Sequence, residues 1–145
     1  MQRKILILNG PNLNLLHKRN HSIYGEASLA KIEHDCKELA KQLDLEVELR
    51  QSNSEGELVD IIQFAIENFD GIIINAAAYT HTSVAIRDAL EIFDKPKIEL
   101  HISNIFKREE FRQASYLSDV VDAVISGLGI AGYTISLLAM NDMVK

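Results

Sequence analysis

The chain has 145 residues, enough for one ordinary domain with a buried core but marginal for two. Its composition, 47% hydrophobic and 25% charged with two prolines and seven glycines, is typical of a globular protein and argues against disorder and low-complexity linkers. The formal net charge of −6 argues mildly against nucleic acid or an anionic membrane as the main partner, because both favour a basic surface. A local arginine cluster would still allow an anionic small molecule to bind.

The cysteine content and the start of the chain both favour a cytoplasmic protein. The single cysteine, Cys36, cannot form an internal disulfide, and its helical spacing from Ile32 and Leu39 favours a core position over a reactive thiol. No apolar run approaches the roughly 18 residues needed to span a bilayer. The basic start also leads directly into a strand-like stretch, so we expect neither a membrane span nor a signal peptide.

Strand-like runs alternate with helical periodicity five times along the chain, which is typical of a βαβ architecture. The expected elements, in chain order, are a strand at 4–8, a helix from a Ser28 cap to about 43, a strand at 46–51, a helix after a possible Ser54–Glu57 capping box, a strand at 71–75, a helix at about 83–93, a strand at 97–102, a short polar helix at 104–112, a strand at 123–127 and a helix from about 129 to about 143. We therefore predict a single α/β domain over residues 1–145, with a flavodoxin-like, doubly wound, five-stranded parallel sheet of order 2-1-3-4-5.

Ligands of such sheets bind beyond the carboxyl ends of the strands, near the point where the strand order reverses. The loops after strands one, three and four are therefore the places to search. The first loop is nearly twenty residues long, which indicates function or mobility if it lacks structure of its own. Polar residues gather on all three loops, and they include Asn12, Arg19, Tyr24, Asn75, His81, Ser103, Arg108 and Arg112.

Glu99 and His101 lie two residues apart on the fourth predicted strand, so their side chains point to the same face. A carboxylate beside an imidazole can fix its tautomer, orient the ring and raise its pKa, which suits a general acid. A buried ion pair with a structural role explains the same pair equally well. The position at the carboxyl end of a strand favours the functional interpretation.

Arg19 precedes Tyr24 by five residues on the first loop. A phenol acts as a base near neutral pH only if positive charge stabilises the phenolate, and arginine supplies a charge that persists at any pH. From this pair alone, a tyrosine that packs the loop against the core is the commoner outcome.

The motif at 127–132, GLGIAG, matches the glycine spacing of dinucleotide-binding turns, but it follows the last strand. We interpret it as a tight turn with close helix packing. The other histidines, His17, His21 and His34, lack metal-ligand spacing and are expected in solvent, and we expect no zinc or iron site.

Four motifs together resemble the type II 3-dehydroquinate dehydratases. They are NGPNLNLL at 9–16 with Arg19 and Tyr24-Gly25, QSNSEGEL at 51–58, INAAAYTHTSVAIRDAL at 74–90 and ELHISNIFKREEFR at 99–112, and GLGIAGY follows near the end. The resemblance covers essentially the whole chain. It implies removal of water from 3-dehydroquinate to give 3-dehydroshikimate in the shikimate pathway, through an enolate and without metal, cofactor or Schiff-base lysine.

The resemblance also implies residue roles. Tyr24 would be the base, Arg19 would hold it as phenolate, and Asn12 would help to stabilise the enolate. His101, oriented by Glu99, would protonate the departing hydroxyl. The expected substrate-binding residues are Asn75, His81, Asp88, Ile102, Ser103 and Arg112.

Within that set, the backbone amides and hydroxyl of the Ile102-Ser103 turn would bind the substrate carboxylate, and Asp88 would reach the site of a neighbouring subunit. The family further implies a homododecamer built from four trimers. The chain departs from the family pattern at His17, at Asn20-His21 and at Ala76-Ala77, where a Pro-Gly or similar pair is common. The first two departures fall in the lid between Asn12 and Tyr24.

Two other functions fit the same fold class. A flavin or nucleotide-binding module would need a phosphate loop rich in Ser, Thr and Gly after strand one, where PNLNLL is apolar and amide-rich. A phospho-acceptor signalling domain would need an aspartate at the end of strand three, where Asn75 stands, and an acidic pair where Asn9-Gly10 stand.

Overall fold

The computed structural model describes residues 2–19 and 27–145. Five parallel strands form one sheet of order β2-β1-β3-β4-β5, which confirms the predicted topology. The strands are β1 (Arg3–Asn9), β2 (Leu45–Gln51), β3 (Gly71–Asn75), β4 (Lys97–His101) and β5 (Ala123–Ser126). The α-helices are α2 (Leu29–Leu43), α3 (Glu55–Asn68), α4 (Val84–Ile92) and α5 (Ala131–Met143). Short 3-10 helices are η1 (Leu13–Lys18), η2 (Ala77–His81), η3 (Ile105–Lys107) and η4 (Glu110–Arg112).

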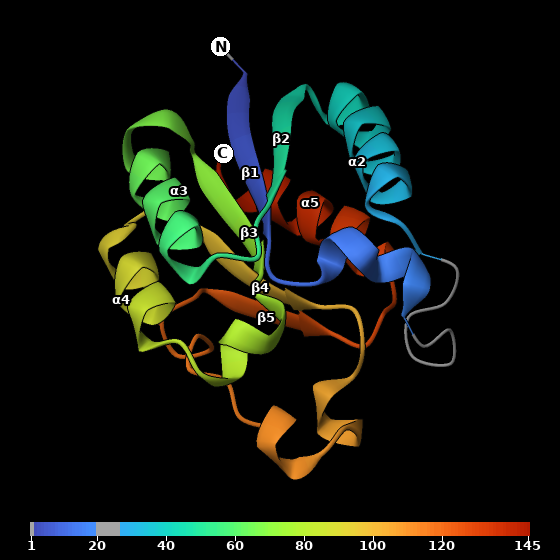
Figure 1. Cartoon of the computed structure of the whole chain (residues 1–145). Coiled ribbons are helices and arrows are strands. Elements are labelled where there is room, and N and C mark those ends of the chain that lie inside the picture. Colours follow the sequence, from blue (N-terminus) through green and yellow to red (C-terminus); the bar gives the residue numbers. More distant parts are fainter. Residues whose placement is uncertain (1, 20–26) are drawn as a thin grey trace.

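The sheet is covered on both faces (Figure 1), because successive side chains of a strand point to opposite sides. On β1, Ile5 and Ile7 pack with α2 and α5, whereas Leu6 and Leu8 pack with α3 and α4. On β4 the same alternation sends Ile98 to the α2–α5 face. Glu99, the next residue, therefore points to the face that α3 and α4 cover.

Three α-helices, α2, α3 and α4, begin at serine caps, which are Ser28, Ser54 and Ser83. Ser28 Oγ accepts a hydrogen bond from Lys31 N at 3.1 Å, which confirms the predicted cap of α2. Ser54 caps α3 in the same way, through Glu57 N at 3.2 Å, but the Ser54 amide donates to Ser52 Oγ at 3.0 Å. The expected capping box is thus formed on one side only.

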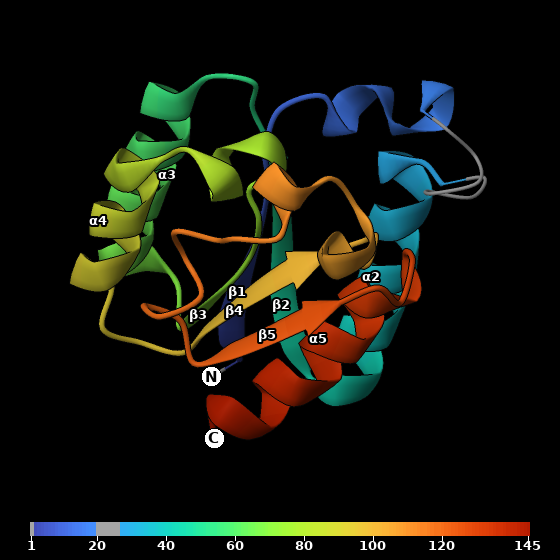
Figure 2. The same cartoon turned by 90° about the horizontal axis from the view of Figure 1, so that it is seen from below.

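One local prediction was wrong. Residues 104–112 do not form one helix, because Arg108 is extended, with φ −95° and ψ −174°, and separates η3 from η4. The first long connection also has structure of its own, since Leu13 and Leu16 are buried three residues apart on η1. Seen from below, η2 and η4 lie side by side beyond the carboxyl ends of the strands (Figure 2).

The glycine-rich segment after β5 forms the tight turn expected from the sequence. Gly127 and Gly129 have φ values of 90° and 64°, in the left-handed region that favours glycine. A Cβ on Gly132 would lie 2.8 Å from Leu100 Cδ1, so this glycine allows α5 to pack closely on β4. Cys36 is buried in the α2–α5 core, as predicted, and burial raises the pKa of its thiol to about 12. None of the helices in the described part of the chain is long and apolar enough to cross a bilayer.

Gly10 lets two of the loops at the carboxyl edge touch. Its amide donates to Asn75 O at 2.8 Å, and a Cβ at this position would lie 2.4 Å from the backbone oxygen of Ala76. Such a contact is far inside van der Waals range and involves rigid backbone. Any side chain here must push the loop after β1 away from the loop after β3.

We therefore expect Gly10→Ala to lower the free energy of unfolding by about 3 kcal/mol, the range of overpacked sites. Urea unfolding followed by circular dichroism measures the change. Gly56→Ala on α3 is the matched control, because its new methyl would meet nothing closer than Ser54 Oγ at 4.0 Å. The control should be stabilised by about 0.5 kcal/mol. An unfolding midpoint of Gly10→Ala equal to that of the wild type would contradict the close-contact argument.

Candidate active site

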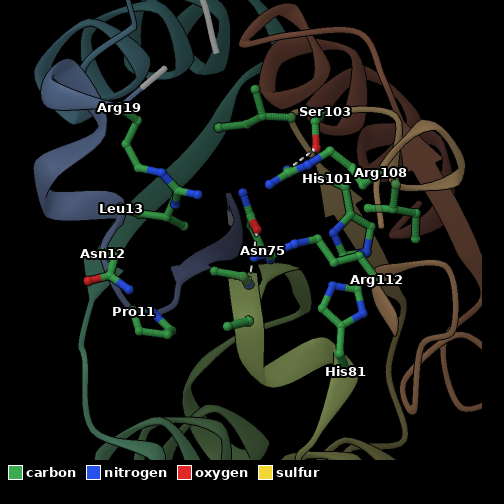
Figure 3. A pocket seen from close by; sticks show the side chains of 14 residues that line it. Pro11, Asn12, Leu13, Arg19, Asn75, His81, His101, Ser103, Arg108 and Arg112 are labelled. Carbon is green, nitrogen blue, oxygen red and sulfur yellow. Dashed lines mark hydrogen bonds between the residues drawn. The ribbon is translucent and has the colours of Figure 1, made fainter. Parts of the chain in front are cut away.

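A cavity lies beyond the carboxyl ends of β1, β3 and β4 (Figure 3). Its position is the one expected for this topology, next to β1 and β3, where the strand order reverses. The ends of β3 and β4 and the loops after β1, β3 and β4 line it with these residues: Pro11, Asn12, Leu13, Arg19, Asn75, Ala77, Ala78, His81, His101, Ile102, Ser103, Ile105, Arg108 and Arg112.

The structure brings most of the predicted site residues together. The cavity lining includes Asn12, Arg19, Asn75, His81, His101, Ile102, Ser103 and Arg112. Glu99 lies behind His101 on β4, and Asp88 is exposed on α4 and does not line the cavity of its own chain. Tyr24 and the Asn20-His21 departure fall outside the described residues. His17 and His34 are exposed, as expected.

The Glu99–His101 pair forms as the strand spacing predicts. His101 Nε2 is hydrogen-bonded to Glu99 Oε2, and the two side chains are 5% and 0% exposed. Burial opposes ionisation of Glu99, but hydrogen bonds from His101, Ser118 and Ser115 outweigh it and hold the pKa of this carboxyl below its ordinary value. A carboxylate only accepts, so His101 Nε2 carries a proton. The other ring nitrogen, Nδ1, is then the atom that can exchange a proton with a ligand.

His81 stands beside His101, with nearly parallel rings whose centroids are 6.5 Å apart. Its Nδ1 donates to Ala114 O at 2.8 Å, because a carbonyl can only accept. Burial lowers the pKa of His81, and the nearby His101 and Arg112 lower it further against the effect of the Ala114 bond. The ring is therefore neutral at neutral pH, and its Nε2 is an acceptor suited to a ligand hydroxyl.

Three arginines line the cavity and make it suitable for an anion. Arg19 comes from the end of η1, whereas Arg108 lies between η3 and η4, Arg112 ends η4, and both approach from the opposite side (Figure 3). Arg108 Nη1 donates to Ser103 Oγ at 3.1 Å, and Arg112 Nε donates to Glu109 Oε2 at 3.1 Å. Sequence reasoning placed Arg108 on this loop but not among the site residues.

The backbone after β4 is turned so that its amides can bind an anion. The carbonyls of His101 and Ile102 accept from Gly127 N at 3.2 Å and Gly129 N at 3.0 Å. A trans peptide places the following N–H opposite each carbonyl. The amides of Ile102 and Ser103 therefore point away from the β5–α5 turn, and both residues line the cavity. Two such amides and the Ser103 hydroxyl match the needs of a carboxylate.

A buried hydrogen-bond chain supports Asn75 from below. Asn75 Nδ2 donates to the Tyr133 hydroxyl at 2.9 Å, and that hydroxyl donates to Asn9 Oδ1 at 2.6 Å. Asn75 Oδ1 accepts from Ala77 N at 3.2 Å. Burial raises the pKa of Tyr133, so it stays a neutral phenol. The sequence signal for this residue was a polar hydroxyl on an apolar helix, and sequence reasoning missed it.

Ala77 holds a left-handed backbone conformation, with φ 53°. This costs a residue with a side chain roughly 1 kcal/mol relative to glycine. The left-handed alanine therefore places mild strain directly in the cavity wall. Within 2–19 and 27–145, no group of three or more His, Cys, Asp and Glu side chains is arranged to hold a metal ion.

Comparison with known proteins identifies relatives over nearly the whole chain. Residues 3–141 match the family described as dehydroquinase class II. A protein of Endomicrobium trichonymphae named 3-dehydroquinate dehydratase is 54% identical over 138 residues, which cover 95% of this chain and 96% of the relative.

Two crystal structures have the same fold. The type II dehydroquinase from Butyrivibrio crossotus superimposes with a TM-score of 0.93 at 46% identity, covering 97% of this chain and 98% of the other. The enzyme from Propionibacterium acnes gives a TM-score of 0.94 at 41% identity and covers 98% of both chains.

The buried chain below Asn75 predicts the effect of Tyr133→Phe. Removing the hydroxyl leaves Asn9 Oδ1 and Asn75 Nδ2 without this partner, which should lower the free energy of unfolding by about 1 to 3 kcal/mol. Chemical denaturation measures the loss. Tyr116→Phe removes the same group from a side chain that is 48% exposed and should change stability by less than about 0.5 kcal/mol. Equal free energies of unfolding for the two variants would show that the buried hydroxyl does not stabilise the fold.

Proposed function

The chain belongs to the dehydroquinase class II family, and from this premise we propose that it removes water from 3-dehydroquinate to give 3-dehydroshikimate. The observation that carries the proposal is the Glu99–His101 pair, a proton-transfer group beside a cavity lined by three arginines. The substrate is an anion with a ketone and hydroxyl groups. The arginines, amides and neutral His81 supply complementary partners for each of these features.

The reaction needs a base that takes a proton from the carbon next to the ketone. Such a proton is weakly acidic, so the base must act together with stabilisation of the developing enolate. We assign the base to the phenolate of Tyr24, held ionised by Arg19. The position of Arg19 on the cavity wall supports this assignment, and Asn12 on the same wall is placed to help stabilise the enolate oxygen.

The second step breaks the carbon–oxygen bond of the β-hydroxyl, which is a poor leaving group unless protonated. We assign the proton to His101. Glu99 accepts from Nε2, so His101 enters this step with a proton on each ring nitrogen, gives up the one on Nδ1 and keeps the one on Nε2, and the hydroxyl leaves as water. The enolate oxygen re-forms the ketone, and the carbon–carbon electron pair of the enolate shifts to form the new double bond as the carbon–oxygen bond breaks. One proton has moved to Tyr24 and one has left His101, so exchange with water restores both groups.

Substrate binding uses both sides of the cavity. The substrate carboxylate is assigned to the amides of Ile102 and Ser103 with the Ser103 hydroxyl. The ring hydroxyls are assigned to Asn75, His81 and Arg112. The exposed position of Asp88 on α4 is compatible with its predicted reach into a neighbouring subunit of a homododecamer built from trimers. The cytoplasm remains the proposed compartment.

The two other functions considered from the sequence have less support. Asn9 and Asn75 are paired residues at the ends of β1 and β3, where a phospho-acceptor domain needs carboxylates. For a flavin, the phosphate loop would have to follow β1, where buried Leu13 and Leu16 instead anchor η1 to the core. Both observations favour the dehydratase.

The direct test is an ultraviolet assay of purified protein with 3-dehydroquinate. The product is a conjugated enone, so absorbance should rise, and neither a chelator nor borohydride should stop the reaction. A flat absorbance trace from folded protein would contradict the proposal.

Variants then test the assigned roles. Tyr24→Phe and His101→Ala should each lower kcat by roughly 10²- to 10⁴-fold, the usual contribution of general acid–base groups. His34→Ala is the control, because this exposed histidine of α2 lies outside the cavity lining. If Tyr24→Phe kept near-wild-type turnover, the proposed base would be wrong.

A further inference from the structure

The loop between η4 and β5 contacts the back of the Glu99–His101 pair. Ser115 Oγ donates to Glu99 Oε2 at 2.8 Å, and Ser118 Oγ donates to Glu99 Oε1 at 2.6 Å. His101 shares Oε2 with Ser115. Each carboxylate oxygen therefore has a donor of its own, which prevents rotation of the group and fixes the oxygen that His101 faces.

Contacts with Glu99, with the core beneath α3 and α4, and with Arg87 hold the loop between η4 and β5 in place. Ser115 Oγ also accepts from Leu117 N at 3.0 Å, so its single proton is directed to Glu99. Leu117 is buried with the side chains of α3 and α4. Ser118 is exposed, but its neighbour Asp119 accepts hydrogen bonds from Nη1 and Nη2 of Arg87 on α4, the second at 2.9 Å.

Arg87 also binds the loop backbone. Its Nη1 donates to Tyr116 O at 2.8 Å, and Tyr116 N donates to Thr80 O at 2.8 Å. The loop is thus connected to both α4 and η2, the elements before β4. The two serine hydroxyls are presented to Glu99 from a fixed backbone rather than from a free surface segment.

The positively charged side chains near Glu99 bond to other groups or face the cavity, so apart from His101 the donors to the carboxylate are neutral hydroxyls. Lys97 precedes Glu99 on the same face of β4, but its ammonium donates to Leu90 O at 2.8 Å. His81 of η2 and Arg112 of η4 approach from the cavity side, beside His101. A cation bonded to Glu99 would stabilise the carboxylate but oppose protonation of His101. Serine hydroxyls stabilise the carboxylate without that penalty.

We propose that Ser115 and Ser118 are positioning residues of the site, whose hydroxyls keep the Glu99 carboxylate ionised and aimed at His101. The proposal rests on the proposed function for its catalytic consequence, but the hydrogen-bond coupling itself does not depend on the substrate. Without these donors, fewer hydrogen bonds offset the cost of burying the negative charge of Glu99, and the carboxylate rotates or takes up a proton.

The catalytic test compares Ser118→Ala and Ser115→Ala with wild type over a range of pH. Each variant should lower kcat at least about tenfold with KM changed less than about threefold. As the pH is lowered, each variant should also lose activity at a higher pH than the wild type does. The sign follows because a carboxylate with fewer donors protonates at higher pH. Ser118→Thr keeps the hydroxyl and should restore most of kcat.

A second readout needs no substrate. In protein labelled with carbon-13 histidine, the His101 ring resonances sense the charge of Glu99, and their acid-side inflection should move up by about one pH unit in Ser118→Ala. Ser136→Ala is the matched control, since Ser136 is buried on α5 across the sheet, and among the described residues its hydroxyl has no hydrogen-bond partner. This control should leave the inflection and kcat unchanged.

The outcomes separate the two proposals. If the His101 inflection shifts in Ser118→Ala but the wild-type protein does not dehydrate 3-dehydroquinate, the serine assignment stands and the proposed function is overturned. Normal turnover and an unshifted inflection in both Ser118→Ala and Ser115→Ala would overturn the serine assignment. Should Ser118→Ala unfold, the titration of Ser115→Ala and the rescue by Ser118→Thr decide the question.

Discussion

A carboxylate that water cannot reach must have its charge compensated inside the protein. Glu99 meets this requirement through His101, Ser115 and Ser118, and it remains ionised although its side chain is 0% exposed. The orientation of His101 depends on this one compensated charge. The histidine in turn connects the buried sheet to the polar cavity, so the proton chemistry of the site depends on a hydrogen-bond arrangement beneath it.

The sheet supplies the geometry that makes this arrangement possible. Strand alternation sends Ile98 and Leu100 of β4 into one core and leaves Glu99 and His101 on the opposite face. Parallel pairing aligns Asn9 with Asn75 at the same edge, and Gly10 allows the two loops beyond them to touch. The turn after β5 then binds the carbonyls that follow β4. Core packing, the close loop contact and the glycine turn therefore all determine where the cavity groups point.

Much of this was predictable from short-range patterns. Strand order, the Glu99–His101 pair and most of the cavity residues follow from alternation and from the loops of a doubly wound sheet. The partners of Glu99 do not, because Ser115 and Ser118 lie 16 and 19 residues away on an irregular loop. Tyr133 is 58 residues from Asn75, and no local pattern indicates that contact. The break between η3 and η4 was missed because Arg108 is compatible with a helix but is extended here.

The central claim concerns where one proton lies. Neutron diffraction from deuterated crystals at neutral pH locates it directly, because it shows the deuterons that X-rays leave unseen at ordinary resolution. The account predicts a deuteron on His101 Nε2, both serine deuterons directed at Glu99, and a bare carboxylate. A deuteron bound to Glu99, with His101 Nε2 unprotonated, would contradict it.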